Sequence, residues 1–135
     1  EGVTLEYIRL TKNFEEIKEY VRHKGDTLTG YNQTREKVSV RIEDILYFET
    51  GRHVTLIHTL TDTISITKVL SEVCEDFEQN PEFLKVGRSY LINRLYVRNV
   101  DQAEIEMMNS AVIPIPVRLQ REIRQQLKED RFSKT

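Results

Sequence analysis

The sequence predicts a mainly β fold of the α+β class, in which short antiparallel strands combine with about three helices. The first observation is that short β-prone segments recur along the chain with turn residues between them, which favours pairing between neighbours. The second is a change to a helical spacing of apolar residues over residues 67–79. The third is a closing segment, residues 117–128, in which Leu119, Ile123 and Leu127 recur every four residues.

The chain of 135 residues is most simply one domain with short additions at its ends. Residues 3–9 alternate apolar and polar side chains as a strand does, and Asn13 can cap a helix that ends near Gly25. We therefore expect a strand–helix extension at residues 1–25, a main body at residues 26–128 and a frayed tail at residues 129–135.

Alternation and β-branched content predict the strands of the main body. They are expected around Leu28 and Tyr31, then at residues 38–42, 45–48, 54–60, 63–66, 90–92, 96–100, 103–107 and 111–115. Two hairpins are predicted, one turning at Thr61-Asp62 and the other at Met108-Asn109-Ser110. Pro114 and Pro116 place the last strand at an edge or a terminus, because proline donates no hydrogen bond to a neighbouring strand.

One helix of the main body is predicted within residues 67–79 and stops at Asn80-Pro81. Its apolar face carries Val69, Leu70, Val73, Cys74 and Phe77, with acidic residues on the other side. Cys74 is therefore expected in the core and not as a reactive thiol. The second helix covers residues 117–128 and exposes Arg118, Arg121, Arg124 and Lys128.

Composition and motifs argue against several classes of function. A single cysteine fits the reducing cytoplasm, and no apolar run approaches the about 20 residues that a membrane span needs. The glycines are scattered, so no phosphate-binding loop is predicted, and three histidines in unrelated contexts make no zinc site. His58 is interpreted as an exposed strand histidine. We therefore expect no enzyme activity, cofactor, metal, small-molecule substrate or membrane partner.

Charge is unevenly placed in a chain whose net charge is −2. Residues 72–82 hold five acidic residues and no basic one, whereas residues 85–98 hold four basic residues and no acidic one. Further cations lie at chain connections, at Arg52-His53 and at Arg118 with Arg121. Loops at one end of a rigid scaffold are a common binding surface, and arginine binds both guanine and phosphate. Charge alone leaves two interpretations open, a nucleic-acid-binding surface and the scattered charge of a solvated surface.

Four blocks of the sequence, taken in order, resemble the LytTR-type DNA-binding domain. They are IEDILYFET (residues 42–50), VTLIHT (54–59), FLKVGRSYLIN (83–93) and IPIPVR (113–118). The family pattern has an I-x-Y-hydrophobic-E block, a strand like V-x-I-x-T, a helix, a block close to F-x-R-x-H-R-S ending in V-N, and a closing strand like I-P-V-S-R. No single block is very specific, whereas the ordered set, from about Asp26 to Lys128, is specific.

The resemblance implies an elongated, mainly β arrangement of short antiparallel sheets. It also implies a bacterial transcription regulator that places loops into successive major grooves of double-stranded DNA. By the same resemblance, the base-reading residues are Arg52, His53, Arg88 and Arg118, and the phosphate contacts are Lys85, Ser89 and Arg121. Family members usually bind paired repeats, so a second copy of the chain is an expected partner.

Three positions depart from the family pattern. Gly87 replaces the histidine of H-R-S, Lys85 replaces the arginine of F-x-R, and Pro116 stands where serine is common. Family members often carry a receiver domain before this module, whereas residues 1–25 resemble the short extension of stand-alone, response-regulator-like members. Gly87 and the acidic total leave an alternative open, a protein-interaction or sensing module on the same fold with weakened DNA binding.

Overall fold

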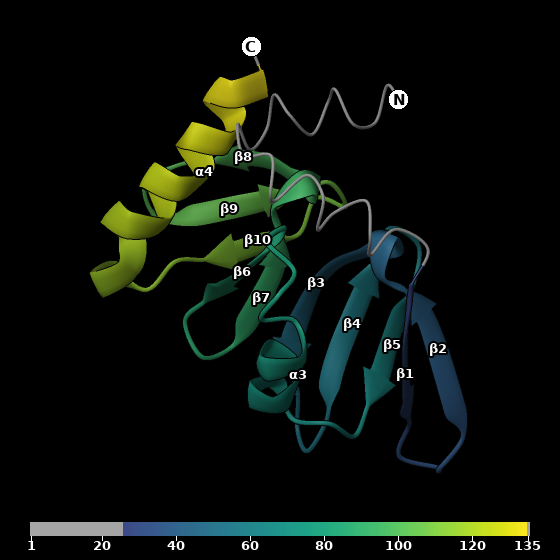
Figure 1. Cartoon of the computed structure of the whole chain (residues 1–135). Coiled ribbons are helices and arrows are strands. Elements are labelled where there is room, and N and C mark those ends of the chain that lie inside the picture. Colours follow the sequence, from purple (N-terminus) through teal and green to yellow (C-terminus); the bar gives the residue numbers. More distant parts are fainter. Residues whose placement is uncertain (1–25, 135) are drawn as a thin grey trace.

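A five-stranded antiparallel sheet is the centre of the structure, which is a computed structural model that describes residues 26–134 (Figure 1). Its strand order is β5-β4-β3-β7-β6. The strands are β3 (Ile45–Thr50), β4 (Thr55–Thr59), β5 (Thr63–Ile66), β6 (Phe83–Val86) and β7 (Tyr90–Asn93). The strand and helix predicted for residues 3–25 lie outside the described residues.

Two smaller antiparallel sheets accompany the central one. The first is the hairpin of β1 (Thr27–Tyr31) and β2 (Lys37–Arg41). The second has the order β10-β9-β8 and consists of β8 (Val97–Val100), β9 (Glu104–Met107) and β10 (Val112–Pro114). Both predicted hairpins are confirmed, as is the edge position of the last strand.

Two α-helices, and not about three, lie within residues 26–134: α3 (Leu70–Asp76) and α4 (Gln120–Lys134), which correspond to the two helices predicted for this part of the chain. The same part of the chain contains three single 3-10 turns: η1 (Ile42–Asp44), η2 (Arg94–Tyr96) and η3 (Val117–Leu119). The third predicted helix falls in residues 13–25, outside the described residues. The prediction of a frayed tail at residues 129–135 stays a prediction.

Helix α3 begins later than predicted because hydrogen bonds to neighbouring strands hold Thr67 and Lys68 outside the helix. The amide of Thr67 donates to the carbonyl of Tyr31 at 2.9 Å, and Oγ1 of Thr55 donates to the carbonyl of Lys68 at 2.6 Å. Val69 then caps the helix with extended backbone and is 48% exposed, so it does not belong to the buried face as predicted.

The central sheet separates two hydrophobic cores. One lies under α3 and the β1–β2 hairpin, and the other lies under the β8–β10 sheet and α4. Strand β3 serves both cores, because the register shifts between Ile45 and Tyr47 as at a β-bulge. Ile45 and Phe48 therefore face the first core while Leu46 and Tyr47 both face the second, and all four side chains are buried.

Aromatic contacts fix α3 to the central sheet. The ring centroids of Phe77 and Phe83 lie 4.8 Å apart, and that of Phe48 lies 5.2 Å from Phe77 and 5.8 Å from Phe83. These are tilted and edge-to-face geometries, which aromatic rings prefer over direct stacking. Phe83 begins β6, a strand missing from the sequence prediction, and its burial anchors the basic segment that follows.

Asn93 fastens the end of β7 to the start of β3. Its Nδ2 donates to the carbonyl of Ile45 at 3.0 Å, and its Oδ1 accepts from the amide of Leu95 at 3.0 Å. The side chain is 2% exposed, so both bonds are made away from water. Asn93 thereby holds the register of the two strands that carry the connections described next.

Candidate nucleic-acid interface

Three chain connections that are distant in sequence meet at one end of the central sheet. They are the β3–β4 loop (residues 51–54), the β6–β7 turn (87–89) and the segment from Pro116 into η3. The amide of Thr50 donates to the carbonyl of Ser89 at 2.9 Å, which joins the first connection to the second. A Cβ atom on Gly87 would lie 3.0 Å from Cγ of Pro116, so the second connection touches the third. The β6–β7 turn is thus the middle member of a row.

The β3–β4 loop is a tight connection that holds Arg52 and His53 outward. The amide of Gly51 donates to the carbonyl of Val54 at 2.9 Å, and a Cβ on Gly51 would lie 2.9 Å from Cγ2 of Val54. His53 has a φ of 65°, a left-handed conformation that costs a non-glycine residue about 1–2 kcal/mol. The side chains of Arg52 and His53 are both exposed, so the loop directs them to the solvent.

The β6–β7 turn presents Arg88 and Ser89. Gly87 opens it with a φ of 66°, a region that glycine enters without steric cost. Oγ1 of Thr50 donates to the carbonyl of Arg88 at 3.3 Å, which ties the turn to β3 while both Arg88 and Ser89 are exposed. The backbone of the turn is therefore fixed and the arginine side chain points away from the core.

The third connection presents Arg118 and Arg121. The amide of Leu119 donates to the carbonyl of Pro116 at 2.9 Å and closes η3, after which α4 begins. Arg118 and Arg121 are both exposed and three residues apart, a spacing that places them on neighbouring parts of one helical surface. Ile123 and Leu127 bury the opposite side of α4 in the core.

Lys85 lies close to this row but on a different face of the central sheet. Phe83 packs under α3 whereas Leu84 and Val86 face the other core, so alternation directs Lys85 to the α3 side. Burial raises the pKa of the Cys74 thiol of α3, and the charge of Lys85 opposes that rise. Cys74 itself packs at the margin of the core, in agreement with the sequence prediction.

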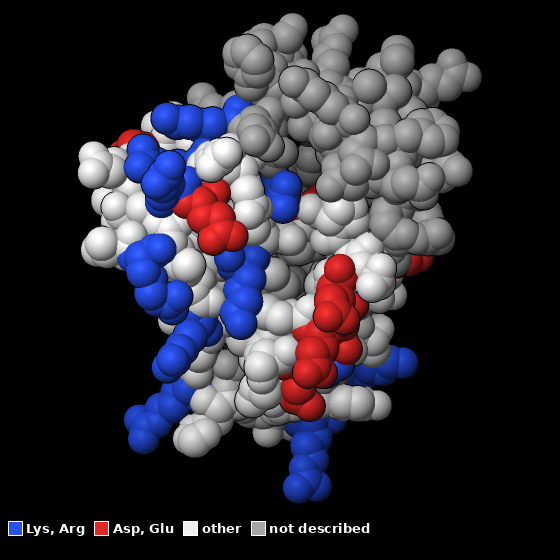
Figure 2. Space-filling view, turned by 60° about the vertical axis from the view of Figure 1, so that its left-hand side comes forward, with Lys and Arg blue, Asp and Glu red and all other residues white. Residues whose placement is uncertain are grey.

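The five cations of the predicted site have no ion-pair partner within the part of the chain that the structure describes. Arg52, Lys85, Arg88, Arg118 and Arg121 are all exposed. By contrast, Arg41 pairs with Glu43 and Lys68 with Asp76, and Arg98 lies 3.3 Å from Glu106. Figure 2 shows basic side chains in a band along one side of the surface, while most acidic side chains on this face form a separate group. Cations placed in this way can bind phosphate or guanine.

A polar cluster joins β3, β4 and β7 through the side chains of Glu49, His58 and Tyr90. Nε2 of His58 lies 2.9 Å from Oε1 of Glu49, and its ring stacks on Tyr47 at 4.3 Å between centroids. The His58 side chain is only 15% exposed, so the prediction of an exposed strand histidine is wrong. Burial raises the pKa of Tyr90, and the Glu49 carboxylate, which accepts from Tyr90 at 3.5 Å, raises that pKa further.

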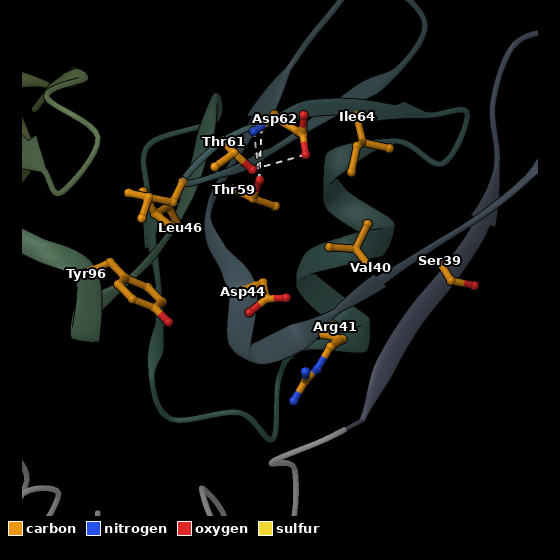
Figure 3. A pocket seen from close by; sticks show the side chains of 11 residues that line it. Ser39, Val40, Arg41, Asp44, Leu46, Thr59, Thr61, Asp62, Ile64 and Tyr96 are labelled. Atoms are coloured by element: carbon orange, nitrogen blue, oxygen red, sulfur yellow. Dashed lines mark hydrogen bonds between the residues drawn. The ribbon is translucent and has the colours of Figure 1, made fainter.

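A cavity of about 460 Å³ lies at the opposite end of the central sheet (Figure 3). The β4–β5 turn at Thr59, Thr61 and Asp62 faces Arg41 and Asp44 across it. Its lining includes hydroxyl and carboxylate groups, and Oγ1 of Thr61 donates to Oδ2 of Asp62 at 3.1 Å within the turn. Within residues 26–134, no group of His, Cys, Asp and Glu has the arrangement of a metal site, and no helix is long and apolar enough to span a membrane.

Val117 lies in the third of the three connections, and the sequence prediction did not include it in the site. It is 84% exposed at the start of η3, next to Arg118. A signal was present in the sequence, because Val117 stands outside the spacing of four that links Leu119, Ile123 and Leu127. An apolar residue outside the buried stripe of an amphipathic segment faces solvent or a partner.

Comparisons with known proteins concern the fold and the family of the chain. The family model described as the LytTr DNA-binding domain matches residues 35–128 of the chain. Among solved structures, the chain is similar to the LytTr DNA-binding domain of a protein described as a methyl-accepting/DNA response regulator from Bacillus cereus. The identity is 18% and the TM-score 0.61, over 75% of this chain and 95% of that chain, a likeness that shows the fold alone. None of the curated proteins compared with the chain matches it.

Proposed function

The chain belongs to the LytTr DNA-binding domain family, and on that premise we propose that it is a sequence-specific transcription regulator that contacts the major groove through loops. The observation that carries the proposal is the meeting of three connections, each of which bears an exposed arginine: Arg52, Arg88 and Arg118. Arginine is the side chain that reads guanine through two parallel hydrogen bonds, and it needs free donors to do so.

We assign the base-reading roles to Arg52, His53, Arg88 and Arg118, and the phosphate contacts to Lys85, Ser89 and Arg121. The row of connections supports this division, because the β6–β7 turn lies between the other two. Arg121 is the second residue of α4, three positions beyond Arg118 along the chain. Lys85 lies on the α3 side of the sheet, where it would approach the DNA backbone beside the groove.

We propose that the protein binds double-stranded DNA in the bacterial cytoplasm, as two copies on paired repeats. The DNA-binding unit is residues 26–128, with residues 1–25 as an extension and residues 129–135 as a tail. The family is a DNA-binding one, so we propose no catalytic role. The net charge of −2 implies weak binding to non-specific DNA, because few phosphates are neutralised.

The test is a titration of the full chain against duplexes that it selects from a random pool, followed by electrophoretic mobility shift. Arg88→Ala should cost about 1–3 kcal/mol at the selected site if Arg88 reads a base. Arg41→Ala is the matched control, because it removes the same charge at the far end of the sheet, where Arg41 lines the cavity. Selection of no duplex, or equal affinity of Arg88→Ala and the parent chain, would overturn the proposal.

A further inference from the structure

Val117 is the most exposed of the large apolar side chains in the described part of the chain, with 84% of its surface accessible. The other exposed ones, Leu60, Tyr31, Val112 and Val69, range from 65% down to 48%. A single exposed apolar residue needs no explanation by itself. The position of Val117, between Pro116 and Arg118 in the row of connections, is what gives its exposure a meaning.

The backbone holds Val117 firmly in this exposed position. Ile115 on one side is 4% exposed, and Leu119 on the other packs against the same core. Pro116 precedes it with a fixed φ of −53°, and the bond from the amide of Leu119 to the carbonyl of Pro116 closes the turn around it. Valine is also stiff at χ1, so its two methyl groups lose little freedom when they meet a partner.

We propose that Val117 determines specificity by contacting the C5-methyl group of a thymine in the major groove. The inference rests on the proposed function, because it needs the row of connections to face base edges. In the major groove the thymine methyl is the apolar group that distinguishes one base from the others, and apolar side chains are its usual contacts. The neighbouring Arg118 supplies the hydrogen-bond donors that Val117 lacks, so the two residues read adjacent features of the site.

A double-mutant cycle between protein and DNA tests this contact. Each thymine of the selected duplex is replaced in turn by deoxyuridine, which lacks only the methyl group, and binding of the full chain is measured. For the parent chain, one replacement should weaken binding about fourfold, the value of one buried methyl group. Val117→Ala should lose a similar factor on the thymine duplex and should be indifferent to deoxyuridine at that position.

Val112→Ala is the matched control, because Val112 is 51% exposed on β10 and lies outside the row. It should keep the full response to deoxyuridine. A response that persists undiminished in Val117→Ala would overturn the role of Val117 and leave the proposed function standing. The same holds if no thymine shows a response while Arg88→Ala still weakens binding to the selected duplex. If the parent chain itself bound no DNA, that result would instead contradict the proposed function.

Discussion

Gly87 and Pro116 are in contact across the β6–β7 turn and the segment before η3, since a Cβ on Gly87 would lie 3.0 Å from Cγ of Pro116. Both positions differ from the family pattern, which has histidine at the first and often serine at the second. The two differences therefore share one place in the structure. A proline ring fits beside the turn because residue 87 has no side chain, and the glycine also supplies the φ of 66° that the turn requires.

The first prediction concerns the stability that Gly87 gives to the turn. Gly87→Ala should lower the free energy of unfolding by about 1–2 kcal/mol, because alanine is strained at this φ and its Cβ meets Pro116. Urea unfolding followed by circular dichroism measures it, with Ser89→Ala as the control in the same turn. Gly87→Asn should cost less, because asparagine tolerates left-handed backbone better than alanine. Equal stability of Gly87→Ala and the parent chain would contradict this account.

The second prediction is that positions 87 and 116 are energetically coupled. Gly87→His should destabilise the chain, whereas Gly87→His combined with Pro116→Ser should recover part of the loss, because serine removes the ring that the new side chain meets. Coupling between contacting residues is typically about 0.5–3 kcal/mol. The four unfolding free energies of the cycle give the coupling directly. Strictly additive effects would show that the contact between the two positions has no energetic consequence.

The sequence predicted the local elements better than their meeting points. The alternation of Val38 and Val40 was sufficient to predict strand β2. The spacing of Leu119, Ile123 and Leu127 was sufficient to predict the buried side of α4. Strand β6 was missed because Lys85 interrupts a short segment whose side chains serve two different cores. The pairing of β3 with β7 joins residues about 40 positions apart, and no local pattern carries that information.

The same limit applies to the candidate site. The cations at Arg52, Arg88 and Arg118 were identified from their places in connections, but only the pairing of β3 with β7 brings the first two connections together. His58 was misjudged because alternation along one strand does not show that Tyr47 covers its ring from the neighbouring strand. Long-range packing therefore decides which of the predicted residues become neighbours.

The third prediction concerns Asn93 and the register of β3 and β7. Asn93→Ala should lower the free energy of unfolding by about 2–4 kcal/mol, because it leaves the carbonyl of Ile45 and the amide of Leu95 without their partners away from water. Thermal and urea unfolding measure the loss. Asn99→Ala is a control, since Asn99 is an exposed asparagine of β8 and should change stability by less than about 0.5 kcal/mol. A loss no larger than that of the control would contradict the structural role of Asn93.

The fourth prediction separates stability from binding at His53. His53→Gly should raise the free energy of unfolding by roughly 0.5–1 kcal/mol, because glycine relieves the left-handed strain at a φ of 65°. The same change should weaken binding to the selected duplex, since it removes a proposed base contact. Unfolding and mobility-shift titrations on one preparation measure both effects. A gain in stability with unchanged DNA affinity would remove His53 from the interface and leave the strain without a function.

The last prediction distinguishes phosphate contacts from base contacts by their dependence on salt. Arg121→Ala should weaken binding to selected and unrelated duplexes by similar factors and should reduce the slope of log affinity against log salt by about 1. Arg88→Ala should instead lower affinity mainly for the selected duplex.

Arg88→Lys should resemble Arg88→Ala, because lysine keeps the charge but loses the planar pair of donors that guanine requires, whereas Arg121→Lys should bind nearly as the parent chain does. Titrations at several salt concentrations decide the matter. If Arg88→Lys restored full affinity, Arg88 would be a phosphate contact, and the base-reading role would fall to Arg52, His53 and Arg118.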